Sequence, residues 1–316
     1  MKNEVFSGNH LMIKVIQAKK ILTMNPRNPI ATHMSILNGR ILQVGSIEKI
    51  APVEKYELDD SFKDLIIMPG LVEGHSHLFE GTLWNKLYCG YFDRQKPDGS
   101  IQKGTKNVNE LISNLKHAED KIKDSKTALS GWGLDPIYFS EKSVDRVILD
   151  KVSEKRPIGI LHASGHKLNV NSLGLKLAGF LRPGINHDGL PLGKDGIPTG
   201  EIRGAETIAL VTKHVGLGKD WLSGDAEGLR NFGKICTRAG VTTATDLANL
   251  QTDETVEMML KVTSEANFPA RIVSFRYMQG ISPKELIPKV LKLKKKSTEN
   301  LRLGSIKIVA DGSIQG

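Results

Sequence analysis

Cysteine is scarce in this sequence. The 316-residue chain has only two cysteines, Cys89 and Cys236, which lie far apart in the sequence. Two distant cysteines cannot form the disulfide framework of a small secreted domain or a cysteine-rich zinc motif. Their scarcity suits a reducing compartment, so we expect a cytoplasmic protein.

Long apolar runs are also missing. No uninterrupted apolar stretch is long enough to cross a bilayer, and residues 1–8 lack the apolar core of a secretory signal. We therefore expect neither a signal peptide nor a membrane partner. The hydrophobic content of 39% and the charged content of 25% are typical of a globular chain with one large domain or two smaller ones.

Acidic residues are too few to balance the basic ones, and the net charge is +9. Such a charge can favour an acidic partner. The densest basic run, at 289–296, carries no aromatic residues, and the apolar residues around it follow a helical spacing. We interpret it as the solvated end of a helix and expect no nucleic-acid partner.

The most informative stretch is residues 65–77. An apolar run is interrupted by Pro69-Gly70, and a second short run ends in His75-Ser76-His77. Because side chains at i and i+2 on a strand point the same way, two imidazoles can lie side by side. They would be half of a zinc-type site, at a strand end where parallel barrels bind ligands. The alternative is a pair of half-exposed strand histidines.

The start of the chain has the pattern of a small β unit. Residues 1–10 resemble a disordered polar tail. Residues 11–66 are strand-like, and Asn38-Gly39 lies between two β-rich runs. Asn-Gly predicts a hairpin there, because both turn residues need a positive φ.

The end of the chain alternates regularly between strand-like and helical patterns. We expect strands at 240–246, 269–275 and 303–311, and helices at 253–266 and 283–295. This alternation predicts βαβ units with right-handed crossovers and a parallel sheet. The predicted fold class is therefore α/β, a TIM-type (β/α) barrel beside the β unit.

The middle of the chain is less regular. We expect a long loop at 84–104, buried strands at 127–133 and 157–162, and helices at 107–124, 143–152, 171–178, 199–215 and 220–239. Ser143 is the expected cap of its helix, Thr199-Gly200-Glu201 is expected to open another, and Gly240 should follow the last.

Taken in order, several motifs resemble the amidohydrolase superfamily, in its YtcJ-like branch, which includes N-substituted formamide deformylases. The resemblance runs from about residue 21 to the end. Its features are the small β domain, Pro-Gly-Leu-Val-Glu-Gly-His-Ser-His at 69–77, Gly-Trp-Gly-Leu-Asp at 131–135, Ser-Gly-His at 164–166 with Asn171 downstream, Gly200-Glu201, Gly-Val-Thr-Thr at 240–243, and Lys307 with Asp311-Gly312-Ser313.

The resemblance implies an incomplete barrel over residues 67–316. Its strands one to four would be the His-X-His strand, the Gly-Val-Thr-Thr strand, 271–275 and 305–310, with a large insertion at 85–215 after strand one. The family takes two more histidines from strands five and six and a general-base Asp from strand eight. We expect these beyond Gly316, in a longer enzyme, and we expect 11–66 to be the N-terminal half of a composite, sandwich-like β domain.

The resemblance also implies a chemistry. It predicts hydrolysis of a non-peptide carbon–nitrogen bond, in an amide, formamide or cyclic amide, with one or two divalent metal ions, zinc being expected. The implied metal ligands are His75, His77 and Lys307. The lysine would act as a carbamate, and the alternative is a strand lysine that points to solvent.

Three further residues are predicted to bind a small-molecule substrate: His166, Glu201 and Trp132. Their alternatives are backbone capping for His166, helix capping for Glu201 and packing for Trp132. For His162 a hydrogen-bonded core position is equally favoured, and for Asp246 a helix N-cap or a structural hydrogen bond is favoured over a site role.

One rival function stays open at this stage. The chain could be a catalytically inactive, truncated remnant that binds metal or another protein. Open sheet edges in an incomplete barrel would also favour association, so a homo-oligomer is among the expectations.

Overall fold

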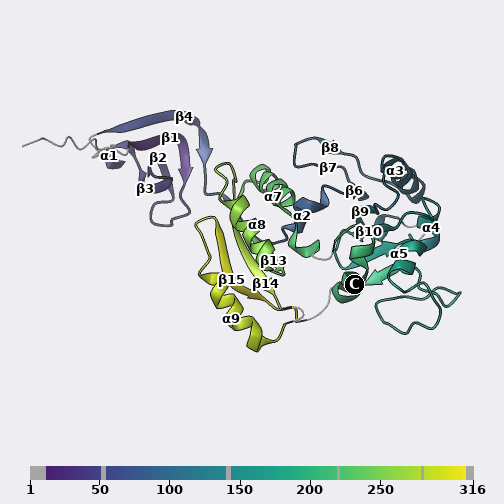
Figure 1. The fold of residues 1–316 in the computed structure, drawn as a ribbon. Helices are drawn as coiled ribbons and strands as arrows, with labels where there is room; N and C mark the ends of the chain where they lie inside the picture. Colours follow the sequence, from purple (N-terminus) through teal and green to yellow (C-terminus); the bar gives the residue numbers. More distant parts are fainter. Residues whose placement is uncertain (1–11, 51–54, 140–143, 219–220, 279–280, 311–316) are drawn as a thin grey trace, which may run out of the picture. The chain divides into compact units, whose positions relative to one another are not determined.

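The computed structural model describes residues 12–50, 55–139, 144–218, 221–278 and 281–310. The chain divides into two compact units, Met1–Leu71 and Val72–Gly316, which are coloured from purple to yellow along the sequence in Figure 1. The tail expected at 1–10 and the cap expected at Ser143 lie outside the described residues. No helix in the described part of the chain has the length and apolar character that crossing a membrane requires.

The first unit contains a four-stranded sheet of order β3-β2-β1-β4. Strands β1 (Ile13–Leu22), β2 (Ile30–Leu37) and β3 (Arg40–Gly45) are antiparallel neighbours, and β4 (Tyr56–Ile67) runs parallel to β1. Asn38 and Gly39 have φ values of 51° and 74°, so the predicted hairpin turn is confirmed. The short helix α1 (Ile47–Ile50) follows β3. The sandwich-like arrangement stays a prediction.

The second unit contains a sheet of order β15-β14-β13-β5, which carries the histidine pair. Its strands are β5 (Leu71–Ser76), β13 (Val241–Asn249), β14 (Arg271–Tyr277) and β15 (Leu301–Lys307). Strand β14 is parallel to both β13 and β15, and helices α8 (Asp253–Thr263) and α9 (Pro283–Lys294) make the connections. The predicted βαβ units are therefore confirmed.

Helices of this unit begin at well-formed caps. The Asp225 side chain accepts a hydrogen bond from the Gly228 backbone at the start of α7 (Ala226–Arg238), and Gly240 follows this helix with a φ of 70°. Ser282 and Glu285 form a capping box at α9. Side chains from the helices and the sheet share one apolar core, which includes Leu78, Phe232, Met259, Ile272 and Leu301.

A bulge in β15 decides which way Lys307 faces. Val273 pairs with Arg302, but Phe275 pairs with Ser305, so β15 carries an extra residue at this point. Gly304 lies there with a φ of 100°, and a Cβ on it would come within 2.5 Å of the Lys294 Cβ. Beyond the bulge, Lys307 pairs with Tyr277. Ile272 of β14 packs in the core with the helices, so Tyr277, an odd number of positions further along the strand, is on the other face. Lys307 shares this face, which is opposite the helices.

The insertion forms a second sheet, of order β12-β11-β10-β9-β6. Strands β6 (Leu87–Tyr88), β9 (Leu129–Leu134) and β10 (Ile158–His162) are parallel, whereas β11 (Lys167–Val170) and β12 (Glu201–Arg203) are antiparallel additions. The remaining elements are α2 (Phe79–Leu83), the short hairpin β7 (Arg94–Gln95) with β8 (Ile101–Gln102), α3 (Val108–Asp120), α4 (Arg146–Asp150), α5 (Ser172–Leu177) and α6 (Ala205–Val211), with one-turn 3-10 helices at Pro136–Tyr138, Thr212–His214 and Trp221–Ser223.

Two helix predictions in this region are wrong in their starting points. Glu201 does not open a helix but lies in β12, and the helix begins at Ala205 after Gly204, whose φ is 79°. Pairing with β11 supplies partners that local pattern cannot show. The helix expected from residue 220 begins at Ala226, because Asp225 caps it. Asp145 caps α4 with a hydrogen bond that its side chain accepts from the Ile148 backbone.

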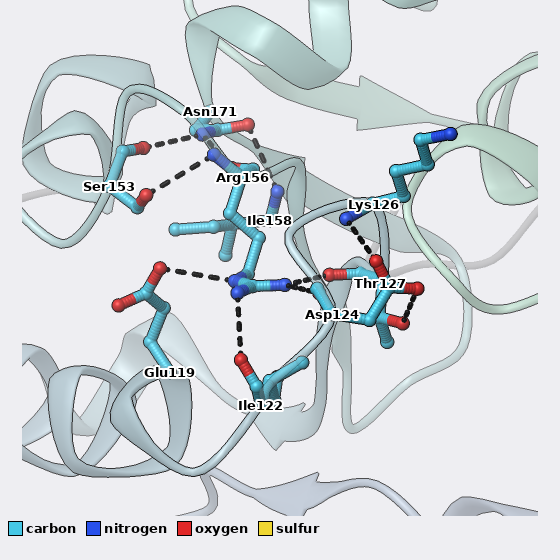
Figure 2. A network of polar contacts seen from close by, with 9 residues as sticks. All are labelled: Glu119, Ile122, Asp124, Lys126, Thr127, Ser153, Arg156, Ile158 and Asn171. Carbon is cyan, nitrogen blue, oxygen red and sulfur yellow. Dashed lines mark hydrogen bonds and ion pairs between the residues drawn. The ribbon is translucent and has the colours of Figure 1, made fainter.

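A buried polar network joins loops of the insertion (Figure 2). The guanidinium of Arg156, 6% exposed, donates to the Glu119 carboxylate at 3.0 Å and to the carbonyl oxygens of Ile122, Asp124 and Thr127. Asn171, fully buried, donates to the Arg156 and Ser153 carbonyls, both at 2.9 Å, and accepts from the Ile158 and Gly174 backbones. Every guanidinium nitrogen therefore has an acceptor.

Candidate metal centre

The paired histidines lie at the end of β5. Their ring centroids are 5.5 Å apart, with the planes at 77°. Ser76, between them, is buried and donates from its Oγ to the Thr245 carbonyl of β13 at 2.5 Å. The serine thus holds β5 against its neighbouring strand. The two imidazoles come close together, as their i, i+2 spacing predicts.

His77 is held in its neutral form. Its pKa is lowered to about 4, first by burial and then by the charges of His75, Lys307 and His166. Its Nδ1 atom is buried and has no hydrogen-bond partner among the described residues. A neutral imidazole with a free nitrogen is the form that binds a metal ion. The structure therefore brings four predicted site residues within electrostatic range of one another.

The donor set fits a metal only in part. No group of three His, Cys, Asp or Glu side chains suited to a metal ion occurs in the described ranges. His75 and His77 supply two imidazoles, and Lys307, half-buried at the end of β15, lies near enough to affect the pKa of His77. Catalytic zinc takes three protein ligands as a rule, so these residues would supply only part of such a ligand set.

A cavity of about 430 Å³ adjoins His77. Its lining comes from α2, β7, β9, β10 and α7, which are far apart in the sequence, and includes Phe79, Trp84, Trp132 and Leu161. Trp132 is 6% exposed and lies here, as the substrate-binding prediction requires. The cavity has the size of a small-molecule site, and its walls combine aromatic and aliphatic side chains with charged and polar ones.

His166 lies on the exposed turn between β10 and β11. Strand β11 follows it directly, and the helix expected at 171–178 comes after that strand as α5. Its neighbours Ala163–Gly165 line the cavity, and its charge lowers the pKa of His77. A role near the site is therefore compatible with its position.

His162 and Glu201 belong to the second sheet. His162 is buried, its Nε2 meets the Asn169 amide oxygen, and burial lowers its pKa. It is thus the hydrogen-bonded core histidine that one of the two sequence-based interpretations expects. The residue also lines the cavity. Glu201 accepts from the Arg203 Nε at 2.6 Å and lies 3.9 Å from the Lys167 Nζ. Its contacts are with its own sheet, and its substrate role stays a prediction.

Asp246 supports the segment that carries His77. It is fully buried and accepts hydrogen bonds from the Leu78 backbone at 3.4 Å, the Asn249 amide at 2.8 Å and the Ser274 hydroxyl at 3.3 Å. Burial raises its pKa to about 6. The expected structural hydrogen bond is confirmed, and it fixes the residue next to His77.

Sequence reasoning missed four charged residues of the cavity, Glu80, Asp93, Arg94 and Arg238. They come from α2, from β7 and the residue before it, and from α7, and they belong to no recognisable motif. The only signal was the length and composition of the stretch at 84–104, which suggested a loop near a site. Within it, Arg94 lies on β7 with its guanidinium 5.7 Å from the ring centroid of Trp132.

Comparison with known proteins agrees with this arrangement. Two solved structures have the same fold: an uncharacterized metal-dependent hydrolase from Pyrococcus horikoshii OT3 (TM-score 0.62, 16% identity, 95% of this chain and 55% of that chain) and one from Pyrococcus furiosus (TM-score 0.60, 18% identity, 95% and 57%). Protein LONG AFTER FAR-RED 3 from Arabidopsis thaliana is 27% identical over 93% of this chain and 49% of its own length.

This chain thus spans about half the length of these relatives. The model of the amidohydrolase family matches residues 63–316, which include the histidine pair, the insertion and the βαβ units. The superfamily predicted from the motifs is therefore confirmed, and the chain belongs to the amidohydrolase family.

Proposed function

We propose that this chain is the N-terminal portion of a metal-dependent hydrolase that cleaves a non-peptide carbon–nitrogen bond in an amide, formamide or cyclic amide. The observation that carries this proposal is the free Nδ1 of a neutral His77, beside His75 and next to a substrate-sized cavity. A buried nitrogen without a partner costs free energy unless a ligand satisfies it. The YtcJ-like branch is part of this proposal.

The architecture proposed is the first half of a TIM-type barrel. The strands β5, β13, β14 and β15 follow one another in space in the order of the sequence, with parallel pairing between β13, β14 and β15. Sequential parallel strands joined by helices are the repeating unit of such a barrel. The histidine pair lies at the C-terminal end of the first strand, where barrel enzymes place their sites.

In this proposal His75 and His77 hold a divalent cation, zinc being expected, and Lys307 is a further ligand as its carbamate. The cation would supply Lewis acidity for a carbonyl oxygen and for water. The chain's own residues do the rest: Asp246 fixes the backbone after His77, and the aromatic wall with Trp132 excludes water from one side of the site. The substrate is a small molecule, and the setting proposed is the cytoplasm.

Metal analysis of the purified chain tests the proposal. We expect stoichiometric zinc after dialysis against a zinc buffer, and at least a tenfold weaker affinity in a His75→Ala, His77→Ala variant, since losing even the hydrogen-bond partner of a metal ligand typically costs about 10–100-fold in affinity. His117→Ala, which removes an exposed histidine of α3, is the matched control and should bind as the wild type does. Equal zinc in all three proteins contradicts the proposal.

One observation favours a second candidate function, metal binding without catalysis. The described residues supply only two imidazoles and a lysine at this place. The full-length protein separates the two candidates, because hydrolysis of a formamide or cyclic amide that requires His75 and His77 supports the enzyme. Zinc binding with no such hydrolysis supports the inactive alternative.

A further inference from the structure

The indole N–H of Trp132 has no acceptor. Its Nε1 atom is fully buried without a hydrogen-bond partner among the described residues, and the side chain is 6% exposed. The same side chain lines the cavity beside His77. Tryptophan N–H groups in protein interiors are normally paired. An acceptor from a bound molecule would therefore remove the free-energy cost of an unpaired buried donor.

Its neighbours keep the Trp132 ring from turning toward another acceptor. Trp84 and Tyr88 pack against it at centroid distances of 5.0 Å, both edge to face. The Tyr88 hydroxyl donates to the Phe92 carbonyl at 2.9 Å and does not accept from the indole, whose Nε1 has no partner among the described residues. The indole is therefore a rigid donor, and an acceptor must come to it.

Arg94 supplies a cation at the same ring. Its guanidinium carbon lies 5.7 Å from the Trp132 ring centroid, and its side chain is exposed at the cavity. No ion pair within 4.0 Å joins Arg94 to an acid in the parts of the chain described. The other cation of the cavity differs, since Arg238 donates to the Lys96 carbonyl at 2.6 Å.

The acids of the cavity leave this cation incompletely compensated. Asp93 is paired with Lys103 at 2.6 Å. Glu80 lies within electrostatic range of Arg94. The lining holds two acids and two arginines, and with Asp93 paired to Lys103 outside the lining, Glu80 is the one acid left to compensate both arginines. An anionic oxygen group is the complementary ligand for a planar guanidinium beside a free N–H donor.

We propose that Trp132 and Arg94 form a subsite for a carboxylate on the substrate. The Trp132 N–H donates to one carboxylate oxygen, Arg94 attracts the charge, and the apolar wall of Phe79, Leu83 and Leu161 covers the body of the molecule. Trp132 is then a specificity-determining residue. The assignment of this ligand as a hydrolysis substrate rests on the proposed function, whereas the subsite itself requires no metal.

Binding of phenylacetate, with phenylacetamide as its neutral counterpart, tests the subsite by calorimetry on the full chain. All titrations contain EDTA, so that a carboxylate cannot bind through a metal. We expect millimolar or tighter phenylacetate binding, weakened roughly tenfold in Trp132→Phe, which keeps the ring and removes the donor. We expect Arg94→Gln to weaken phenylacetate by a similar factor and phenylacetamide by less than twofold.

Two matched variants control for general damage to the cavity. Arg238→Gln removes the cation that already has a partner, and Tyr138→Phe changes an exposed aromatic side chain outside the cavity. Both should bind phenylacetate within about twofold of the wild type, since neither supplies the proposed contacts. Thermal unfolding verifies that every variant folds, and if Trp132→Phe does not, the contrast between Arg94→Gln and Arg238→Gln decides.

The outcomes separate this inference from the proposed function. Unchanged phenylacetate affinity in Arg94→Gln or in a folded Trp132→Phe, an equal loss in Arg238→Gln, or no binding to the wild type overturns the subsite. Loss of phenylacetate binding in Arg94→Gln and Trp132→Phe, in a chain that binds no zinc, supports the subsite and contradicts the metal centre. Zinc binding, together with unchanged phenylacetate affinity in Trp132→Phe, supports the metal centre and contradicts the subsite.

Discussion

The Arg156 network and the His77 centre are both buried and polar, but only the first is complete. In the network, each guanidinium nitrogen of Arg156 and both polar atoms of the Asn171 amide have partners (Figure 2). At the centre, His77 Nδ1 and Trp132 Nε1 are buried without partners among the described residues. Both unsatisfied atoms belong to residues that line one cavity.

The difference separates groups that hold the fold from groups available to a ligand. A satisfied buried network stabilises the surrounding loops and resists substitution. Unsatisfied donors and acceptors lower stability until something binds. The comparison can be tested by removing one member of each region, and the expected effects are described from the largest to the smallest.

The largest effect is expected from Arg156→Ala. It leaves the Glu119 carboxylate and the carbonyls of Ile122 and Thr127 without their donor, so we expect a loss of about 3–5 kcal/mol in the free energy of unfolding. Arg230→Ala is the control, because it breaks an arginine–glutamate contact that is more exposed and should change stability little. Urea unfolding measures both. Equal losses in the two variants would mean that the buried network contributes no more to the free energy of unfolding than the more exposed ion pair does.

The next effect concerns pH in the metal-free protein. The pKa of His77 falls from 6.5 to about 4 on folding, so its contribution is fully present above pH 6.5 and is lost as pH falls toward 4, by about 2–3 kcal/mol. The pKa of Asp246 rises from 3.8 to about 6, so its contribution is present below 3.8 and is lost as pH rises toward 6.

The two residues therefore have opposite slopes in nearly the same pH window. We expect His77→Leu to make stability fall more steeply with rising pH than in the wild type, and Asp246→Asn to make it rise more steeply. Urea unfolding at pH steps between 4 and 7, in EDTA, measures the difference from the wild type. Two variants with parallel pH profiles would contradict the opposed titrations.

The smallest effects compare two histidines directly. His162→Leu removes the partner of the buried Asn169 oxygen, and we expect a loss of about 1–3 kcal/mol at pH 7. His77→Leu removes a nitrogen that has no partner, so without metal we expect a change below about 1 kcal/mol. Thermal and urea unfolding in EDTA provide the measurement. A larger loss for His77→Leu would show that its ring is needed for the fold.

Much of the small β unit and of the sheet that carries the histidine pair could be predicted, because their sequence signals are local. The His75–His77 spacing, the Asn38-Gly39 turn and the alternation of helices and strands after Gly240 depend on residues a few positions apart, and each is found. The insertion was harder. Glu201 was placed at a helix start, but its segment adds to β11 as a strand, and strand pairing depends on a partner elsewhere in the chain.

By itself, then, the sequence determined the paired imidazoles, the βαβ rhythm and the family, since periodicity, turn chemistry and motif order are properties of the chain alone. Only the tertiary structure decided that Trp132 and Arg94 share a cavity with His77, and that a bulge at Gly304 turns Lys307 to the face opposite the helices. The physical reason is that these features arise from contacts between distant segments and from strand register, which no local pattern encodes.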